Sequence, residues 1–356
     1  MDRCLQAALP LRSKSRTGLE RFTFRGWPYV YEQFYGLAER PFDLTPNPRY
    51  LLLTPSHREA LANLDYGISS RKGLIVLTGE AGTGKTTLLR RVMAKGVSGT
   101  GRARSVRSVY LSNPTLSRSE FVEYLARGFG LSPDAHTSKA CLLAELEVTL
   151  TGLLRSDTAV ALVIDEAQSL PYDLMEEIRL LANIESDTDK LLPVVLVGQP
   201  ELGERLNELT LRQLKQRVAL RCQLDPLELH HTAAYIAHRL TLAGGDPASV
   251  FSREAVIAIH ERSHGIPRSI NVVCDNALLT GFALERRPIE SDVIAEVGDD
   301  FDLTPAISGR DDHTGTLART FPPGVDERED DELADETRGV GSPRPLRWRE
   351  PERRTP

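Results

Sequence analysis

The stretch LIVLTGEAGTGKT, residues 74–86, decides the fold. Its second part, residues 79–86, fits the phosphate-loop pattern G-x-x-x-x-G-K-[ST], after an apolar run and before a helical segment. The glycines let backbone N–H groups turn inward around a β-phosphate, and Lys85 adds a positive charge beside the phosphate oxygens. Thr86 presents a hydroxyl group to Mg²⁺. The stretch therefore predicts a nucleotide site between a buried strand and a helix.

A second motif follows another apolar run. Residues 159–166 read AVALVIDE, so two acids come at the tip of a predicted buried strand. Asp165 suits Mg²⁺, directly or through water, and Glu166 suits a general base that polarises an attacking water molecule. An apolar run that ends in Asp-Glu is a weak signal alone, but combined with the phosphate loop it predicts nucleotide hydrolysis.

The spacing of apolar residues predicts the fold class and the domains. We expect an α/β fold in residues 31–226, with a parallel sheet between helices, and a small all-helical domain in residues 227–300. Three of the expected strands are almost continuously apolar, as strands buried on both faces are. The five expected strands are Leu74–Leu77, Ser105–Leu111, Ala159–Ile164, Pro193–Val197 and Ala219–Leu224.

The segments between the strands show helical spacing, for example Arg118–Phe129 and Ala140–Leu154. The second of these carries a stripe of leucines at positions 142, 143, 146, 150 and 153. Such a stripe either binds a partner or packs on the sheet. Packing is the interpretation that we favour, because a helix that covers a sheet needs one apolar face.

Composition excludes several classes of protein. The chain has 356 residues and a net charge of −6, which argues against a general affinity for DNA phosphates but not against a local basic patch. The four cysteines are scattered, with no CxxC pair and no metal-ligand spacing, so we expect reduced thiols. Neither a transmembrane run nor a signal-peptide core is evident. We therefore expect a cytoplasmic protein, either free or peripheral to the inner membrane.

Further motifs carry a resemblance to a known family. The chain resembles the AAA+ ATPases of the ExeA/GspA type, the general secretion pathway protein A group, which is related to Orc/Cdc6-like and TniB-like ATPases. The resemblance covers about residues 31–300. Besides the two nucleotide motifs, it is carried by residues 31–37 (YEQFYGL), 40–46 (RPFDLTP), 53–61 (LTPSHREAL), 197–202 (VGQPEL) and 265–268 (GIPR).

The resemblance implies ATP and Mg²⁺ as cofactors and a P-loop NTPase fold of AAA+ type, with a five-stranded parallel sheet followed by a helical lid. Phe42 and the helix near Ser56–Ile68 are the expected cover for adenine. No guanine-recognition motif is evident, which favours ATP. The expected nucleotide-binding residues are Gly79, Glu80, Ala81, Gly82, Thr83, Gly84, Lys85, Thr86, Thr87 and Asp165, of which Thr86 and Asp165 would hold the metal.

The resemblance also assigns roles at the ends of two strands. Gln199 follows the fourth strand, where AAA+ proteins place the sensor-1 group that orients water near the γ-phosphate. Asn113 follows the second strand, where relatives carry a residue that holds the catalytic glutamate inactive until a ligand binds. Alternatively, the Asn-Pro pair at 113–114 simply starts a turn.

Two arginine positions complete the implied catalytic set. Arg217 precedes the fifth strand, where AAA+ proteins carry an arginine finger that reaches the γ-phosphate of a neighbouring subunit. Arg212 is the alternate, and a solvated basic face is the competing interpretation. Arg268 follows Pro267 at a helix start and matches sensor 2, the lid residue that contacts the phosphates.

The function implied is an ATP-hydrolysing motor or switch that assembles into a homo-oligomeric ring and serves secretion or the export of a surface polymer. Many relatives continue into a transmembrane helix and a peptidoglycan-binding module, and this chain matches neither. Two alternatives stay open. One is a nucleic-acid-linked ATPase of the transposition-helper type, and the other is a nucleotide-dependent switch with little turnover.

Both ends of the chain differ from its centre. Residues 301–356 are rich in charge and proline and poor in aliphatic side chains, so we expect disorder there. Residues 1–30 are basic and aperiodic, and the resemblance begins abruptly at Tyr31. We expect either that translation starts at Val30, from a GTG codon, or that residues 1–30 form a basic arm that touches anionic lipid or nucleic acid.

Overall fold

The computed structural model describes residues 11–14, 20–23, 31–45, 47–97, 106–186, 189–301 and 303 of the chain. The strands are β1 (Leu11–Lys14), β2 (Glu20–Thr23), β3 (Leu74–Gly79), β4 (Val106–Leu111), β5 (Ala159–Ile164), β6 (Val194–Gly198) and β7 (Val218–Leu224). The α-helices are α1 (Glu32–Tyr35), α2 (Pro55–Ser69), α3 (Lys85–Lys95), α4 (Arg118–Phe129), α5 (Pro133–Thr137), α6 (Lys139–Arg155), α7 (Tyr172–Leu181), α8 (Pro200–Arg205), α9 (Arg212–Lys215), α10 (Leu229–Leu242), α11 (Pro247–Val250), α12 (Arg253–Ser263), α13 (Pro267–Ala283) and α14 (Ser291–Asp300). Three 3₁₀ turns join them, namely η1 (Pro48–Tyr50), η2 (Ala167–Ser169) and η3 (Leu209–Leu211).

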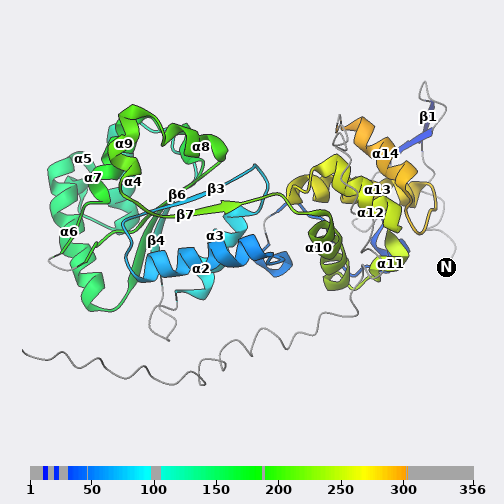
Figure 1. The fold of residues 1–356 in the computed structure, drawn as a ribbon, viewed down its shortest axis with the longest axis horizontal. Helices are drawn as coiled ribbons and strands as arrows, with labels where there is room; N and C mark the ends of the chain where they lie inside the picture. The colour runs from blue at the N-terminus through cyan, green and yellow to red at the C-terminus, as the bar shows by residue number, and fades with distance from the viewer. Residues whose placement is uncertain are drawn as a thin grey trace, which may run out of the picture. The chain divides into compact units, whose positions relative to one another are not determined.

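Five strands form one sheet in the order β4-β5-β6-β3-β7, and every neighbouring pair is parallel (Figure 1). Each strand begins within one residue of its predicted start, which confirms the predicted fold class. Strand β3 lies between β6 and β7, whereas β4, the next strand of the sheet along the chain, lies at the far edge. Because all five strands run the same way, the loops after β3, β5 and β6 all lie at the carboxyl ends of the strands. This is the side of the sheet where α/β proteins bind ligands.

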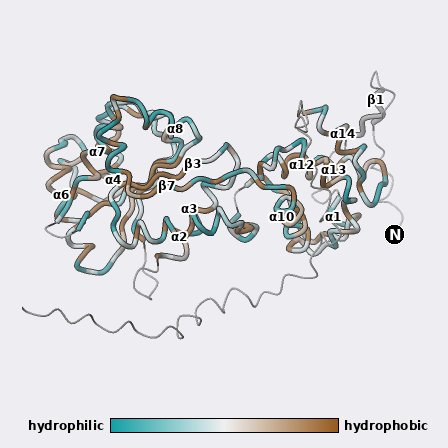
Figure 2. Tube along the Cα trace, viewed as in Figure 1, coloured by the Kyte–Doolittle hydropathy of each residue, from teal (hydrophilic) through white to brown (hydrophobic). Residues whose placement is uncertain are grey.

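Each face of the sheet is covered by its own set of helices. Ile75 and Leu77 of β3 pack in a core with α2 and α3, while Leu74 and Val76 pack in a second core with α4, α6 and α7. The alternation follows from the two-residue period of a strand. The strands at the centre of the sheet are coloured as hydrophobic along their length (Figure 2), as expected for a sheet buried on both faces.

The leucine stripe packs in this core, as predicted. Leu142, Leu146 and Leu150 of α6 are buried in the same cluster as strands β4 and β5, and Leu143 and Leu153 pack against that cluster. On the same helix, Val148 is 74% exposed. The helix therefore has one apolar face that is satisfied by the sheet and its neighbouring helices.

Residues 227–301 consist of helices α10 to α14 and their connections, as expected for a helical lid. The hydrophobic cluster of these helices also contains Tyr35 and Phe42 from the segment at the start of the resemblance. Arg239 of α10 is buried and holds this segment, since its Nε donates to the carbonyl oxygen of Pro41 at 2.5 Å. The predicted boundary at residue 31 assigned this segment to the sheet domain, whereas its side chains pack with the lid helices.

The two ends of the chain lie largely outside the described residues. In the first 30 residues the structure describes β1 and β2, which pair antiparallel, and the expectations for this segment stay predictions. The predicted disorder of residues 301–356 falls outside the description, except for residues 301 and 303. Among the described residues, none of the helices is both long enough and apolar enough to cross a membrane.

Candidate nucleotide site

The phosphate loop joins β3 to α3 and takes a backbone shape that glycine permits. Gly82 and Gly84 have φ angles of +88° and +99°, which side-chain-bearing residues rarely adopt. Helix α3 begins at Lys85, so its first N–H groups and the positive end of its dipole face the loop. Positive φ angles at two glycines followed directly by a helix start are the backbone features expected of a phosphate loop, and anion binding by residues 79–86 stays a prediction.

The Lys85 ammonium group is folded back onto the loop. Its Nζ donates to the carbonyl oxygen of Gly79 at 2.7 Å and to that of Glu80 at 2.9 Å. Burial lowers the pKa of Lys85, while the carboxylates of Glu166 and Asp165 act in the opposite direction. The Lys85 ammonium group is therefore held against the loop backbone. Phosphate oxygens would bind it more strongly than these neutral carbonyl groups, because they carry negative charge.

Asp165 lies beside the first turn of α3. Its Oδ2 atom accepts from the Thr86 hydroxyl at 3.0 Å and from the Tyr110 hydroxyl at 2.5 Å. Burial, and then the hydrogen bond to Asp165, raise the pKa of Tyr110, so this phenol stays a donor. A hydroxyl and a carboxylate oxygen this close are hard ligands of the kind that Mg²⁺ prefers, so the predicted pair fits this metal.

Glu166 begins a tight turn directly after β5. Its backbone has φ +54° and ψ +36°, a left-handed conformation that is uncommon for a residue with a side chain. Its Oε2 atom accepts a hydrogen bond from Nε2 of Gln168 at 2.6 Å. Glu166 also lines the cavity that contains the phosphate loop, and its assignment as the base stays a prediction.

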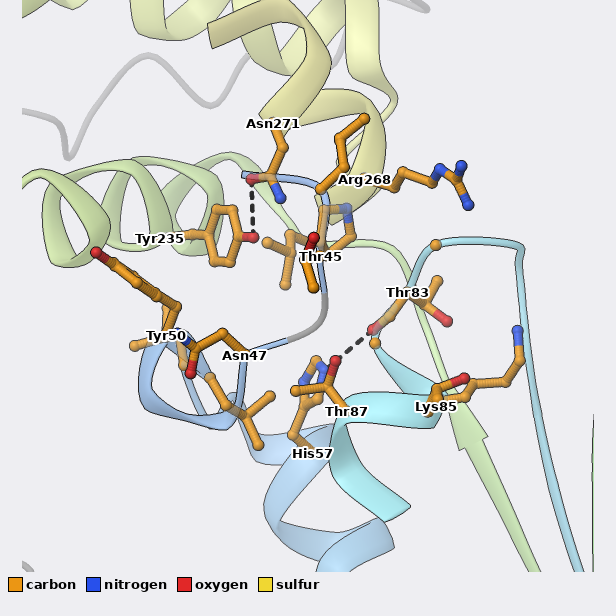
Figure 3. A pocket seen from close by; sticks show the side chains of 18 of the residues that line it. Thr45, Asn47, Tyr50, His57, Thr83, Lys85, Thr87, Tyr235, Arg268 and Asn271 are labelled. Atoms are coloured by element: carbon orange, nitrogen blue, oxygen red, sulfur yellow. Dashed lines mark hydrogen bonds between the residues drawn. The ribbon is translucent and has the colours of Figure 1, made fainter. Parts of the chain in front are cut away.

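The loop is also held from outside by α2. His57 is buried, and its Nε2 lies 3.2 Å from the carbonyl oxygen of Thr83 (Figure 3). Its Nδ1 lies 2.5 Å from Oγ1 of Thr54, the residue that caps α2. Burial is the main cause that lowers the pKa of His57, so the neutral ring is favoured. The resemblance included this histidine within residues 53–61 but gave it no role, because a buried histidine near a loop has no pattern of its own.

A cavity of about 250 Å³ opens beside the loop, lined also by the segment around residues 43–52 and by the lid (Figure 3). Of the two features expected to cover adenine, α2 contributes only His57, and Phe42 is buried in the lid cluster and is not in the lining. The aromatic walls come instead from Tyr50 and from Tyr235, whose hydroxyl donates to Asn271 at 3.0 Å. These walls come from positions that the local sequence does not mark.

Arg268 brings the lid to the loop. Helix α13 begins at Pro267, and the backbone N–H of Arg268 donates to the carbonyl oxygen of Gly82 at 3.2 Å. The Arg268 side chain is exposed and lines the cavity together with Lys85 (Figure 3). A guanidinium group at this position is free to meet phosphate oxygens, as the sensor-2 assignment requires.

Two predicted strand-end residues lie outside the cavity lining. Gln199 follows β6, and its backbone N–H donates to Oε1 of Gln168 at 3.1 Å, while its own side chain is half-buried. Asn113 accepts a hydrogen bond from the N–H of Thr115 at 3.3 Å, which is the turn-starting alternative. The described partner of the Glu166 carboxylate is Gln168, not Asn113.

The two candidate finger arginines lie outside the cavity lining, and Arg217 lies at the amino end of β7. Arg217 precedes Val218, which pairs with Leu74 at the start of β3. It is half-buried, and its Nε donates to Oδ1 of Asn183 at 2.6 Å. Arg212, at the start of α9, is exposed. The structure therefore does not bring either arginine to the phosphate loop of its own chain.

Comparison with known proteins identifies relatives at two levels. Residues 68–206 match the family profile of an AAA domain. The General secretion pathway protein A of Aeromonas hydrophila is 40% identical over 254 residues, which make up 71% of this chain and 45% of that protein. The chain thus spans less than half the length of this relative. The match confirms the resemblance that the N-terminal and Gly-Gln-Pro-Glu-Leu segments indicated.

Solved structures share the fold at low sequence identity. The ORC2 protein of Aeropyrum pernix, in its ADPNP and ADP complexes, has a TM-score of 0.55 at 18% identity, covering 74% of this chain and 71% of that chain. The Cdc6p protein of Pyrobaculum aerophilum has a TM-score of 0.52 at 17% identity, covering 73% of this chain and 70% of that chain. Both likenesses support the AAA+ arrangement of sheet and lid.

Proposed function

The chain carries an AAA+ P-loop domain and is similar to general secretion pathway protein A over most of its length, and from this premise we propose that it binds ATP with Mg²⁺ and hydrolyses it. One observation carries the proposal. Lys85, Thr86 and Glu166 line one cavity at the carboxyl edge of the sheet, and the Thr86 hydroxyl lies 3.0 Å from the Asp165 carboxylate.

Phosphate binding is assigned to the loop and its lysine. When ATP enters, its phosphate oxygens replace the carbonyl oxygens of Gly79 and Glu80 as partners of Lys85. Backbone N–H groups of the loop and of the first turn of α3 then donate to the same phosphates. Thr86 and Asp165 would hold Mg²⁺, which when bound neutralises negative charge that develops on the phosphates. The guanidinium group of Arg268 adds positive charge from the lid.

Water activation is assigned to Glu166. Its carboxylate accepts a proton from a water molecule placed in line with the γ-phosphate, so that hydroxide character develops as the terminal phosphate bond breaks. Gln199 is proposed as the polar group that helps to orient this water. ADP and phosphate then leave together with the opening of the lid, which is tied to the loop through Arg268 and Gly82.

Beyond ATP hydrolysis, we propose a role in export. The relative is named for a general secretion pathway, and the similarity to it extends over 71% of this chain. We assign the chain to the cytoplasmic side of the inner membrane, as an oligomer that couples ATP turnover to a secretion or surface-polymer export complex. Capture of the tagged chain from its native membrane fraction, with export components enriched only when Lys85 is intact, tests this assignment.

Two variants test the ATPase itself. Lys85→Ala should abolish ATP binding, because the phosphates lose their main cation. Glu166→Gln should keep binding and block turnover, because the shape of the side chain is retained while the base is lost. Calorimetric titration with Mg-ATP and phosphate release measure the two effects. Normal turnover by Glu166→Gln would show that the base is another residue.

A further inference from the structure

Gln168 lies between the two residues to which the proposed chemistry assigns water activation. Its Nε2 donates to the Glu166 carboxylate at 2.6 Å, and its Oε1 accepts the backbone N–H of Gln199 at 3.1 Å. One amide side chain therefore joins the residue after β5 to the residue after β6. We propose that Gln168 is a positioning residue that holds Glu166 in place for water activation and ties it to the end of β6.

The orientation of the amide is fixed by its two partners. A carboxylate only accepts hydrogen bonds and a backbone N–H only donates, so the nitrogen of Gln168 must face Glu166 and the oxygen must face Gln199. In a reversed amide, the oxygen would face the Glu166 carboxylate and the NH₂ group would face the N–H of Gln199, so neither hydrogen bond could form. The side chain is thus held in one orientation, and it can restrain the carboxylate of Glu166.

The surroundings leave Gln168 little freedom to move. A Cβ atom on Gly198 would lie 2.6 Å from Oε1 of Gln168, so the glycine makes room for the amide. Arg205 of α8 donates through Nη1 to the carbonyl oxygen of Gln168. The neighbouring Ala167 is fully buried in the core. Backbone and side chain of Gln168 are therefore both anchored, as a residue that positions another one needs.

Glu166 needs such a support because its own surroundings are open. Its side chain is exposed at the cavity, and the left-handed backbone at φ +54° directs it away from the strand. Asn113, which follows β4, accepts a hydrogen bond from the N–H of Thr115 in a turn. The Gln168 amide supplies the contact that holds one oxygen of Glu166 while the second oxygen stays available to water.

Substitution of Gln168 by methionine tests the proposal in the full chain. Methionine keeps the length and volume of the side chain but has no amide, so kcat for Mg-ATP should fall about ten-fold or more while the Kd for ATP stays within about two-fold of the wild-type value. Gln168→Glu should reduce kcat further, because a second carboxylate would face Glu166. Gln33→Met, at an exposed position of α1, is the matched control and should leave kcat unchanged.

Three outcomes would overturn the positioning role. Wild-type kcat in Gln168→Met would show that the contact is not used, and a raised kcat would show that it restrains Glu166 instead. A rise in Kd parallel to the fall in kcat would indicate a structural role. If Gln168→Met does not fold, Gly198→Ala displaces the same amide and should give the same separation of kcat from Kd.

The inference rests on the proposed ATPase, and the same assay separates the two. The wild-type chain and Lys85→Ala are measured beside the Gln168 variants. If wild-type turnover does not exceed that of Lys85→Ala, the proposed function fails. If the wild-type chain is active and Gln168→Met matches it, the proposed function stands and the inference about Gln168 fails.

Discussion

The imidazole of His57 holds the carbonyl oxygen of Thr83, with Nε2 and that oxygen 3.2 Å apart. A carbonyl group only accepts hydrogen bonds, so Nε2 must carry the proton, and Nδ1 then accepts from the hydroxyl of Thr54 at 2.5 Å. One neutral histidine thus connects the cap of α2 to the phosphate loop. The shape of the nucleotide site therefore depends on a residue outside the phosphate loop and the Asp165-Glu166 motif.

The stability of the fold should decrease in mild acid. Burial lowers the pKa of His57 below its ordinary value of 6.5, so the unfolded chain takes up a proton at a pH where the folded chain does not. As the pH falls below about 6.5, the free energy of unfolding decreases until the lowered pKa of the folded state is reached. Urea unfolding at two pH values on either side of 6.5 measures this decrease.

The variant His57→Gln measures how much of this decrease in stability is due to His57. Glutamine can still donate to Thr83 but does not titrate, so the decrease in stability on acidification should be smaller than in the wild-type chain. Part of the decrease should remain, because burial also lowers the pKa values of His238 and His260. An unchanged pH dependence in His57→Gln would contradict the role given to His57.

The sequence predicted the fold well where apolar runs and capping residues agree. Helix α4 has the predicted bounds because Ser117 and Glu120 form a capping box at its start and Gly130 ends it in a left-handed conformation. The strands follow from continuous apolar runs. The packing of residues 31–42 against the lid helices was not predicted from the sequence, because contacts between distant segments leave no local pattern.

The site was predictable only where a motif fixes several residues at once. Lys85, Thr86, Asp165 and Glu166 come from two such motifs, and the structure brings Thr86 and Asp165 into contact. Gln168 was missed because its role depends on the left-handed turn at Glu166 and on the end of β6, which meet only in three dimensions. Tyr110 was missed as well, since an aromatic residue in a strand is usually part of the core.

Gly82 should not tolerate alanine. A methyl group there would lie 2.5 Å from Cβ of Arg268, and the φ angle of +88° is unfavourable for any residue with a side chain. We expect Gly82→Ala to weaken ATP binding about ten-fold or more, because the loop and the lid contact both shift. Calorimetric titration with Mg-ATP measures the change.

Gly152→Ala is the matched control for this substitution. Gly152 is an exposed residue of α6 with open space around its Cβ position. Alanine is the better helix former, so the variant should be more stable by about 0.5–1 kcal/mol and should bind ATP normally. Equal ATP affinities for Gly82→Ala and Gly152→Ala would contradict the role of the loop glycine.

The α6 leucines should contribute to stability rather than to partner binding. Leu146 is fully buried, so Leu146→Ala should lower the free energy of unfolding by about 2–5 kcal/mol. Val148→Ala, on the exposed face two residues away, should change it by less than about 0.5 kcal/mol. Urea unfolding compares the two. Similar losses for both variants would show that this face of α6 does not pack as described.

Arg217 lies at the amino end of β7, at the opposite end of the strands from the phosphate loop. Five residue steps of β3, at about 3.3 Å each, separate Leu74 from Gly79, which is about 17 Å. Leu74 is the partner of Val218, and Arg217 lies one residue further from the phosphate loop. That span is longer than an arginine side chain can cover. If Arg217 acts as a finger, it must act on the nucleotide of a neighbouring subunit, and ATP turnover then requires an oligomer.

Mixed subunits test this requirement. Arg217→Ala and Glu166→Gln should each be inactive alone, since one lacks the finger and the other lacks the base. In a mixture, phosphate release should recover in part, because a Glu166→Gln subunit lends its finger to an intact Arg217→Ala site, and mass measurements should show growth with ATP. Arg221→Ala, on the exposed side of β7, should stay active as the control. If a mixture of Arg212→Ala and Glu166→Gln recovers activity and the Arg217→Ala mixture does not, the finger is Arg212. If no mixture recovers activity and the mass does not grow with ATP, the proposal of a finger between subunits is wrong.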